Sequence, residues 1–115
     1  MIESIIKGIT EKKGHEVVCI DLSQVESAIC DCFIICHGDS NTQVNAIAES
    51  VEKETAERLS LRPISVQGAN NAEWVLLDYG HILVHVFQKP FRLRYKLEEL
   101  WGDGKVTRIE ESIKH

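Results

Sequence analysis

One junction in the sequence carries residue types that could bind phosphate. Gly38-Asp39-Ser40 joins an apolar run to a helical pattern over residues 41–60. A glycine and a serine at the start of a helix can present backbone N–H groups to an anion, which the helix dipole also favours. Ser40 and Gln43 also have the spacing of a capping box, which would use the same N–H groups within the protein. The junction is therefore either a phosphate cradle or a turn followed by a helix N-cap.

Phosphoryl or nucleotidyl transfer would need a second feature, a pair of carboxylates that binds magnesium. Such a pair stands at i and i+2 on a strand, so that both side chains lie on one face. Between residues 60 and 87 the acids are Glu73 and Asp78. Leu76 and Gly80 occupy the positions two away from Asp78. Since the pair cannot be built there, we interpret the junction as a turn and N-cap, and we predict no catalytic residue and no cofactor.

The four cysteines raise the question of a metal or redox site. Cys30, Cys32 and Cys36 alternate along one predicted strand face with Ile34, and Cys19 lies on the preceding strand. Zinc needs four converging ligands, whereas a straight strand spreads its thiols along its length. We therefore predict no metal site and interpret the cysteines as buried, reduced side chains that pack as small hydrophobes. A redox switch is the alternative, although the sequence has no Cys-x-x-Cys motif.

His85 is the histidine best placed for catalysis, since it stands inside an apolar strand pattern between Val84 and Val86. A catalytic role would require a nucleophile or carboxylate partner, and Asp78 on the adjoining strand is the nearby candidate. We favour a hydrogen-bonded, partly buried residue of the sheet.

Residues 74–87 predict a β-hairpin with two different faces. Two apolar runs flank the turn, in which Gly80 can adopt the positive φ of a tight reversal. Alternation places Trp74 and Asp78 on one face and Tyr79 on the other. Because both faces carry large apolar groups, we expect helices on one and either more protein or a partner on the other.

Aromatic side chains near this hairpin are the candidates for a binding surface. Aromatic and arginine residues anchor many interfaces because they bury a large area at modest entropic cost. We expect Trp74 to carry the binding, whereas Trp101, at helical spacing from Leu97, is better explained by core packing. Arg92 could contact a partner or pair with a neighbouring acid. The predicted partner-binding residues are Trp74, Asp78, Tyr79, Arg92 and Tyr95.

The hydrophobic pattern predicts a single α/β domain with a mixed sheet and flanking helices, in the order helix, two strands, helix, three strands, helix. Helices are expected at residues 2–13, at 41–60 with Pro63 as the terminator, and from Pro90 or Phe91 to Gly102. Strands are expected near residues 16–21, 31–37 and 64–67 and in the hairpin.

The C-terminal helix is expected to bury an apolar stripe and to leave Glu98 and Glu99 in solvent. The residues of the stripe are Leu93, Leu97, Leu100 and Trp101. We place the domain at residues 1–103 and a weakly patterned tail at 104–115.

Composition restricts the partner. The chain has 115 residues with 18 acids and 13 bases, a net charge of −5, and no basic run longer than Lys12-Lys13. Phosphate binding needs clustered bases, so direct nucleic-acid recognition is disfavoured, and an acidic domain is steered toward basic surfaces. We see no signal-peptide pattern and no apolar run of membrane length, and we expect a cytoplasmic protein.

Several blocks of the sequence resemble one known family. The segment from Arg92 through Tyr95 to Trp101 resembles the Arg-x-x-Tyr-x-Leu-Glu-x-Leu-Trp signature of the ribosomal silencing factor (Iojap) family. Residues 31–40 resemble the family's Asp-x-hydrophobic-run-x-x-Gly-x-Ser segment, and residues 68–78 resemble its middle block. The resemblance covers roughly residues 2–103, with the blocks in the same order and spacing.

The resemblance implies a function and a fold. Members of this family bind the fourteenth protein of the large ribosomal subunit and block joining of the small subunit, under starvation or in stationary phase. Their fold resembles that of nucleotidyltransferases, so a residual nucleotide-binding or nucleotidyltransferase-like enzyme is the alternative. A homodimer through an exposed sheet face is a third possibility, which could coexist with ribosome binding.

Overall fold

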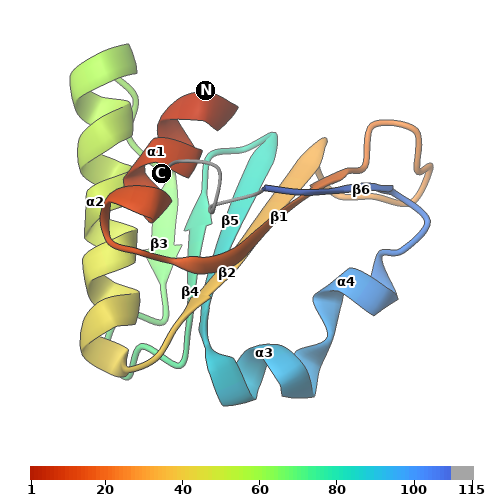
Figure 1. Ribbon diagram of the computed structural model, residues 1–115. Helices are drawn as coiled ribbons and strands as arrows, with labels where there is room; N and C mark the ends of the chain where they lie inside the picture. Colours follow the sequence, from red (N-terminus) through yellow and green to blue (C-terminus); the bar gives the residue numbers. More distant parts are fainter. Residues whose placement is uncertain (110–115) are drawn as a thin grey trace.

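The computed structural model describes residues 1–109, which form one six-stranded mixed sheet with helices on both faces (Figure 1). The elements are α1 (Ile2–Glu11), β1 (His15–Asp21), β2 (Cys32–Gly38), α2 (Asn41–Leu59), β3 (Ser65–Gln67), β4 (Trp74–Asp78), β5 (Ile82–Gln88), α3 (Lys89–Tyr95), α4 (Leu97–Leu100) and β6 (Lys105–Arg108). The strand order is β3-β4-β5-β2-β1-β6, with β2 and β5 parallel and the other neighbours antiparallel. This confirms the predicted α/β fold. None of the helices within residues 1–109 is both long and apolar enough to span a membrane.

One face of the sheet is covered by α1 and α2. The isoleucines of α1 recur at helical spacing, and Ile5 and Ile9 are fully buried. A Cβ on Gly8 would lie 2.7 Å from the Cα of Val51, so the absence of a side chain there permits close packing of α1 against α2. The core on this face also takes the side chains of Val75, Leu77, Tyr79, Ile82, Val84 and Val86 from the hairpin. The predicted sorting of hairpin side chains by face is confirmed.

The opposite face is covered in part by α3, α4 and the loop 22–31. Its apolar cluster contains Phe33 and Phe87 from the sheet and Leu97 from α4, and the half-buried Trp74 and Trp101 pack against it. Figure 1 shows α3 and α4 as an arch on this side of the sheet, with α1 and α2 on the other.

The predicted C-terminal helix is two helices. Lys96 adopts a left-handed conformation with φ 50°, which ends α3 and turns the chain into α4. The change of direction redistributes the apolar stripe: Leu97 is buried, whereas Leu93 and Leu100 are 62% and 70% exposed. The prediction that these two leucines are core residues was therefore wrong.

Within the weakly patterned tail, residues 105–108 form the strand β6. This strand pairs antiparallel with β1, with Cys19 opposite Thr107 and Ile20 opposite Val106. The strand β6 lies at the edge of the sheet, and all four of its residues are exposed. Because none of its side chains is buried, the strand has little apolar signature in the sequence. The last six residues of the predicted tail, 110–115, lie outside the described residues.

The second helix starts as predicted and ends by a different device. Ser40 accepts a hydrogen bond from the Gln43 backbone N–H at 3.1 Å, which confirms the N-cap. At the other end Ser60, with φ 54°, forms a left-handed C-cap. The helix has therefore already ended before Pro63 is reached.

Candidate binding surface

The junction at Gly38 is filled by a side chain of the protein itself. The Oε1 of Gln43 accepts from the Asp39 backbone N–H at 2.7 Å, while its Nε2 donates to the carbonyl oxygens of Lys12 and Lys13. A Cβ on Gly38 would lie 3.2 Å from the Cγ of Gln43. Gln43 therefore takes up backbone donors and space that a phosphate group would require.

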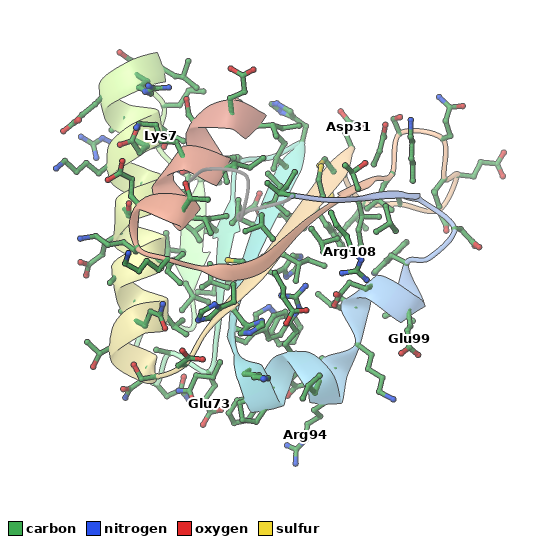
Figure 2. The ribbon with its side chains drawn as sticks, viewed as in Figure 1. Lys7, Asp31, Glu73, Arg94, Glu99 and Arg108 are labelled. Carbon is green, nitrogen blue, oxygen red and sulfur yellow. The ribbon has the colours of Figure 1, made fainter. Side chains whose placement is uncertain are left out.

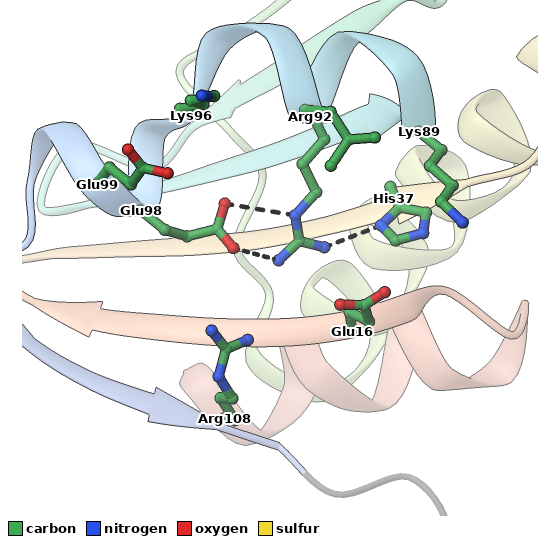
Figure 3. Close-up of a pocket in the computed structure, with 9 residues that line it drawn as sticks. Glu16, His37, Lys89, Arg92, Lys96, Glu98, Glu99 and Arg108 are labelled. Carbon is green, nitrogen blue, oxygen red and sulfur yellow. Dashed lines mark hydrogen bonds and ion pairs between the residues drawn. The ribbon is translucent and has the colours of Figure 1, made fainter.

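A polar pocket of about 270 Å³ lies between the arch and the ends of β1, β2 and β6 (Figure 3). It is lined by Glu16, His37, Lys89, Arg92, Leu93, Lys96, Glu98, Glu99 and Arg108. Figure 3 shows the Arg92 guanidinium at its centre, with Glu98 on one side and His37 on the other. Within residues 1–109 no group of three or more His, Cys, Asp or Glu side chains is arranged to hold a metal ion.

Arg92 is a structural residue of this pocket. Its Nη2 and Nε donate to the two carboxylate oxygens of Glu98 at 2.8 and 3.4 Å, and its Nη1 donates to Nδ1 of His37 at 3.0 Å. Burial, and then the Arg92 charge, lower the pKa of His37, so this ring is a neutral acceptor. Arg92 is 6% exposed. Of the two alternatives for Arg92, the structure shows the pairing with a neighbouring acid, Glu98, and this leaves little of the side chain exposed for a partner.

Tyr79 also departs from the predicted surface. It points into the helix layer, is 7% exposed, and its hydroxyl lies 2.8 Å from that of Thr55 in α2. Its position follows from strand alternation, because Tyr79 shares the face of Val75 and Leu77. Tyr79 packs in the core and leaves little exposed surface for the partner contact that the sequence predicted.

Asp78 lies on the same face as Trp74 but at the far end of β4. Its Oδ1 accepts from the Gly80 backbone N–H at 2.7 Å, and Gly80 has φ 91°. This Asx-type hydrogen bond shapes the hairpin turn. Four residues along a strand separate Asp78 from Trp74 by about 13 Å, so the two side chains do not form one compact group.

Trp74 and Tyr95 are the two predicted residues that the structure brings together. Their rings lie 4.7 Å apart, and the Trp74 ring stacks on Phe87 at 4.9 Å with an interplanar angle of 29°. Trp74 is half-buried and Tyr95 is 45% exposed. Trp74 and Leu76 also line a hollow of about 260 Å³ beside Gln67 and Gly68. We call Trp74, Leu76 and Tyr95 the aromatic surface.

The Trp74 ring is fixed by its neighbour on β5. Its Nε1 donates to Nδ1 of His85 at 3.1 Å, which requires a neutral His85 with its proton on Nε2. Burial lowers the pKa of His85 to about 4. The buried Nε2 has no hydrogen-bond partner within residues 1–109. His85 contacts Phe33 and Trp74 rather than Asp78, so the structure supports its interpretation as a buried sheet residue.

Sequence reasoning missed the residues that hold the aromatic surface in place. Phe87 lies beneath both rings, and its period-2 position on β5 could have identified it. The role of Glu98 had no such signal, because it depends on the left-handed turn at Lys96.

Charged side chains flank the aromatic surface. Glu73 and Arg94 extend outward at the end of the molecule where α3 lies (Figure 2).

These features describe a small α/β protein with a partly exposed aromatic surface and with a helix N-terminus closed by its own side chains. Residues 1–115 match the sequence model of the family described as "Ribosomal silencing factor during starvation". The chain belongs to the ribosomal silencing factor family, which confirms the resemblance found in the sequence.

Individual members of the family are similar in sequence to this chain over most of its length. It is 37% identical over 113 residues to the ribosomal silencing factor of Halalkalibacterium halodurans, covering 98% of this chain and 95% of the relative. It is 37% identical over 100 residues to that of Bacillus subtilis, covering 87% and 83%. The crystal structure of a Chromobacterium violaceum protein superposes with a TM-score of 0.82 at 34% identity, covering 88% of this chain and 82% of the other.

Proposed function

We propose that this protein represses translation by docking on the fourteenth protein of the large ribosomal subunit and excluding the small subunit. Membership of the family supports a ribosome-associated role in silencing translation. The partner and the exclusion mechanism extend that role. Because ribosomal subunits join in the cytoplasm, the proposed mechanism requires the protein to act there.

The aromatic surface is the observation that carries this proposal. Trp74 and Tyr95 contact each other and are both partly solvent-exposed, and Trp74 also lines an apolar hollow. Residues of this kind dominate binding energy when a partner completes their burial. Two further apolar side chains on the arch, Leu93 and Leu100, are exposed as well.

Steric exclusion requires no catalytic group. The competing class, a nucleotidyltransferase-like enzyme, would need the N-terminus of α2 for a triphosphate, and Gln43 occupies that place. Binding and inhibition should therefore proceed without nucleotide and without a magnesium dependence beyond that of the ribosome itself.

The test is a subunit-joining assay with matched variants. Purified protein should cosediment with large subunits and lower the yield of joined ribosomes in proportion to occupancy. Trp74→Ala and Tyr95→Ala should each weaken binding by about 30-fold, the effect of a hot spot worth about 2 kcal/mol. Ile29→Ala, which truncates a 74% exposed apolar residue on the β1–β2 loop, is the control and should bind normally.

Two results would overturn the proposal. One is normal joining at saturating occupancy of large subunits. The other is unchanged binding by both aromatic variants while their thermal midpoints show that they are folded. Light scattering of the free protein, run alongside, would reveal whether a homodimer competes for the same face.

A further inference from the structure

Cys19 and Cys32 form a close pair of thiols that the sequence did not predict. Their Sγ atoms lie 3.1 Å apart, although 13 positions separate them in the chain. In the β1–β2 ladder Cys19 lies opposite Ile34 and Cys32 lies opposite Asp21, so the cysteines are diagonal neighbours on one face. A disulfide has a sulfur–sulfur distance of about 2.05 Å, so the two atoms need to approach by only about 1 Å more.

The pair is reachable from solvent. Cys19 is half-buried and Cys32 is 6% exposed, and both line a hollow of about 530 Å³ on the helix side of the sheet. The hollow also contains charged groups of both signs, including Asp31, which Figure 2 shows extending outward next to β2, and Lys105 of β6. The hollow gives a small-molecule disulfide room to reach the two sulfur atoms.

The two thiols are not equivalent. A hydrogen bond from the Cys32 thiol lowers the pKa of Cys19, against the opposing effects of burial and of Asp21. The same hydrogen bond, together with burial, raises the pKa of Cys32. Cys19 is therefore the better nucleophile and Cys32 the better resolving thiol.

We propose that Cys19 and Cys32 are a site of reversible thiol–disulfide exchange with small-molecule disulfides. The Cys19 thiolate attacks one sulfur of the small disulfide, whose sulfur–sulfur bond breaks and releases one thiolate. Cys32 then loses its proton and attacks the Cys19 sulfur, which forms the Cys19–Cys32 bond and releases the second thiolate. The protein is oxidised by two electrons, and one small disulfide is reduced to two thiols.

The bond would tie β1 to β2 on the helix side of the sheet. The aromatic surface lies on the opposite face, so the exchange site is separate from the proposed ribosome-docking surface. Cross-linking residues 19 and 32 closes a short loop and restricts the unfolded chain, so the oxidised protein should unfold at a temperature higher by about 5 °C or more.

The test treats the folded full-length chain with excess glutathione disulfide. Non-reducing peptide mapping should find a Cys19–Cys32 link, and a small-molecule thiol should remove it. Cys32→Ser should stop at a stable glutathione adduct on Cys19, and Cys19→Ser should give no link. Cys30→Ser is the matched control, because Cys30 is near Cys32 but its Sγ contacts the Cys32 carbonyl oxygen at 3.5 Å instead; it should link normally.

The proposal fails if the treated parent protein carries no Cys19–Cys32 link, or if Cys30 supplies the partner in its place. It also fails if Cys19 forms adducts no faster than Cys30. Peptide mapping of the parent decides the question even if a serine variant does not fold. Circular dichroism before treatment shows that the reacting species is native.

Discussion

At the residue scale, the position of a side chain on β4 decides whether it is available to a partner. Trp74 and Tyr79 were both candidates for binding because both are aromatic and lie on one strand. Strand alternation gives them opposite surroundings: Trp74 lies beside a solvent-facing hollow, whereas Tyr79 reaches Thr55 inside the helix layer. Sequence alone could establish that the two differ, but not which face the arch leaves open.

Tyr79→Phe tests the buried hydroxyl pair. Removing the Tyr79 hydroxyl loses its hydrogen bond to Thr55, and we expect a loss of about 1 kcal/mol of stability with little change in ribosome binding. The Thr55 hydroxyl also lies 3.2 Å from the Glu52 carbonyl oxygen, so it is not orphaned by the change. Urea denaturation of Tyr79→Phe and of the double variant with Thr55→Val would measure the coupling. A loss of affinity without a loss of stability would place Tyr79 in the interface after all.

His85 should make the protein sensitive to acid. An unfolded histidine binds a proton near pH 6.5, whereas burial lowers the pKa of folded His85 to about 4. The unfolded state therefore binds more protons between these values, and the free energy of unfolding falls as the pH falls from about 6.5 to about 4. The full difference is at most about 3 kcal/mol.

The measurement is urea denaturation across that pH range. His85→Gln keeps an acceptor for the Trp74 indole but cannot titrate there, so it should flatten the profile. Part of the slope should remain, because the pKa of His37 is lowered as well. His81→Gln, in the exposed hairpin turn, is the matched control for a histidine-to-glutamine change. An identical slope in His85→Gln and the parent would contradict the assignment.

At the element scale, the helices and strands that bury a continuous apolar face could be predicted from the sequence. The strand β6 and the break between α3 and α4 could not. The isoleucine spacing of α1, the Ser40–Gln43 cap of α2 and the hairpin alternation all have direct signatures. β6 has none, because an exposed four-residue edge strand depends on backbone pairing with β1. The break between α3 and α4 was missed because Lys96 is not a residue type that usually marks a left-handed turn.

The Arg92–Glu98 pair should determine how firmly the arch is held. Arg92 joins α3 to β2 through His37 and to α4 through Glu98. Glu98→Gln would leave a buried guanidinium charge without its carboxylate, and we expect a loss of about 1 to 3 kcal/mol of stability. Hydrogen exchange of residues 89–104 should also accelerate. Glu99→Gln lines the same pocket with an exposed side chain and is the control; equal effects from the two variants would contradict this role.

At the scale of the whole molecule, charge is unevenly distributed over the two faces. The net charge is −5. The helix α2 carries four glutamates, Glu49, Glu52, Glu54 and Glu57, against the two bases Lys53 and Arg58. By contrast, α3 and its C-cap carry the bases Lys89, Arg92, Arg94 and Lys96 and no acid, although Arg92 is paired with Glu98 of α4. The aromatic surface therefore has a basic neighbour within an acidic protein. The net charge and the local charge make opposite contributions to the approach of a basic partner.

Charge reversal on α2 separates these two contributions. Glu49 and Glu57 are exposed on the helix side, away from the aromatic surface, and each Glu→Lys reversal adds two positive charges, so the double variant has a net charge of −1. If the long-range field steers association, the rate of binding to the isolated fourteenth protein should fall severalfold at low salt, and the difference should vanish at about 0.5 M salt because charges are then screened beyond a few ångströms. The dissociation rate should stay unchanged, because α2 makes no contact in the proposed complex.

Stopped-flow association and surface-based dissociation at several salt concentrations measure both rates. A faster dissociation would place α2 in the interface, and an unchanged association rate would show that the basic residues of α3, rather than the net charge, govern the approach.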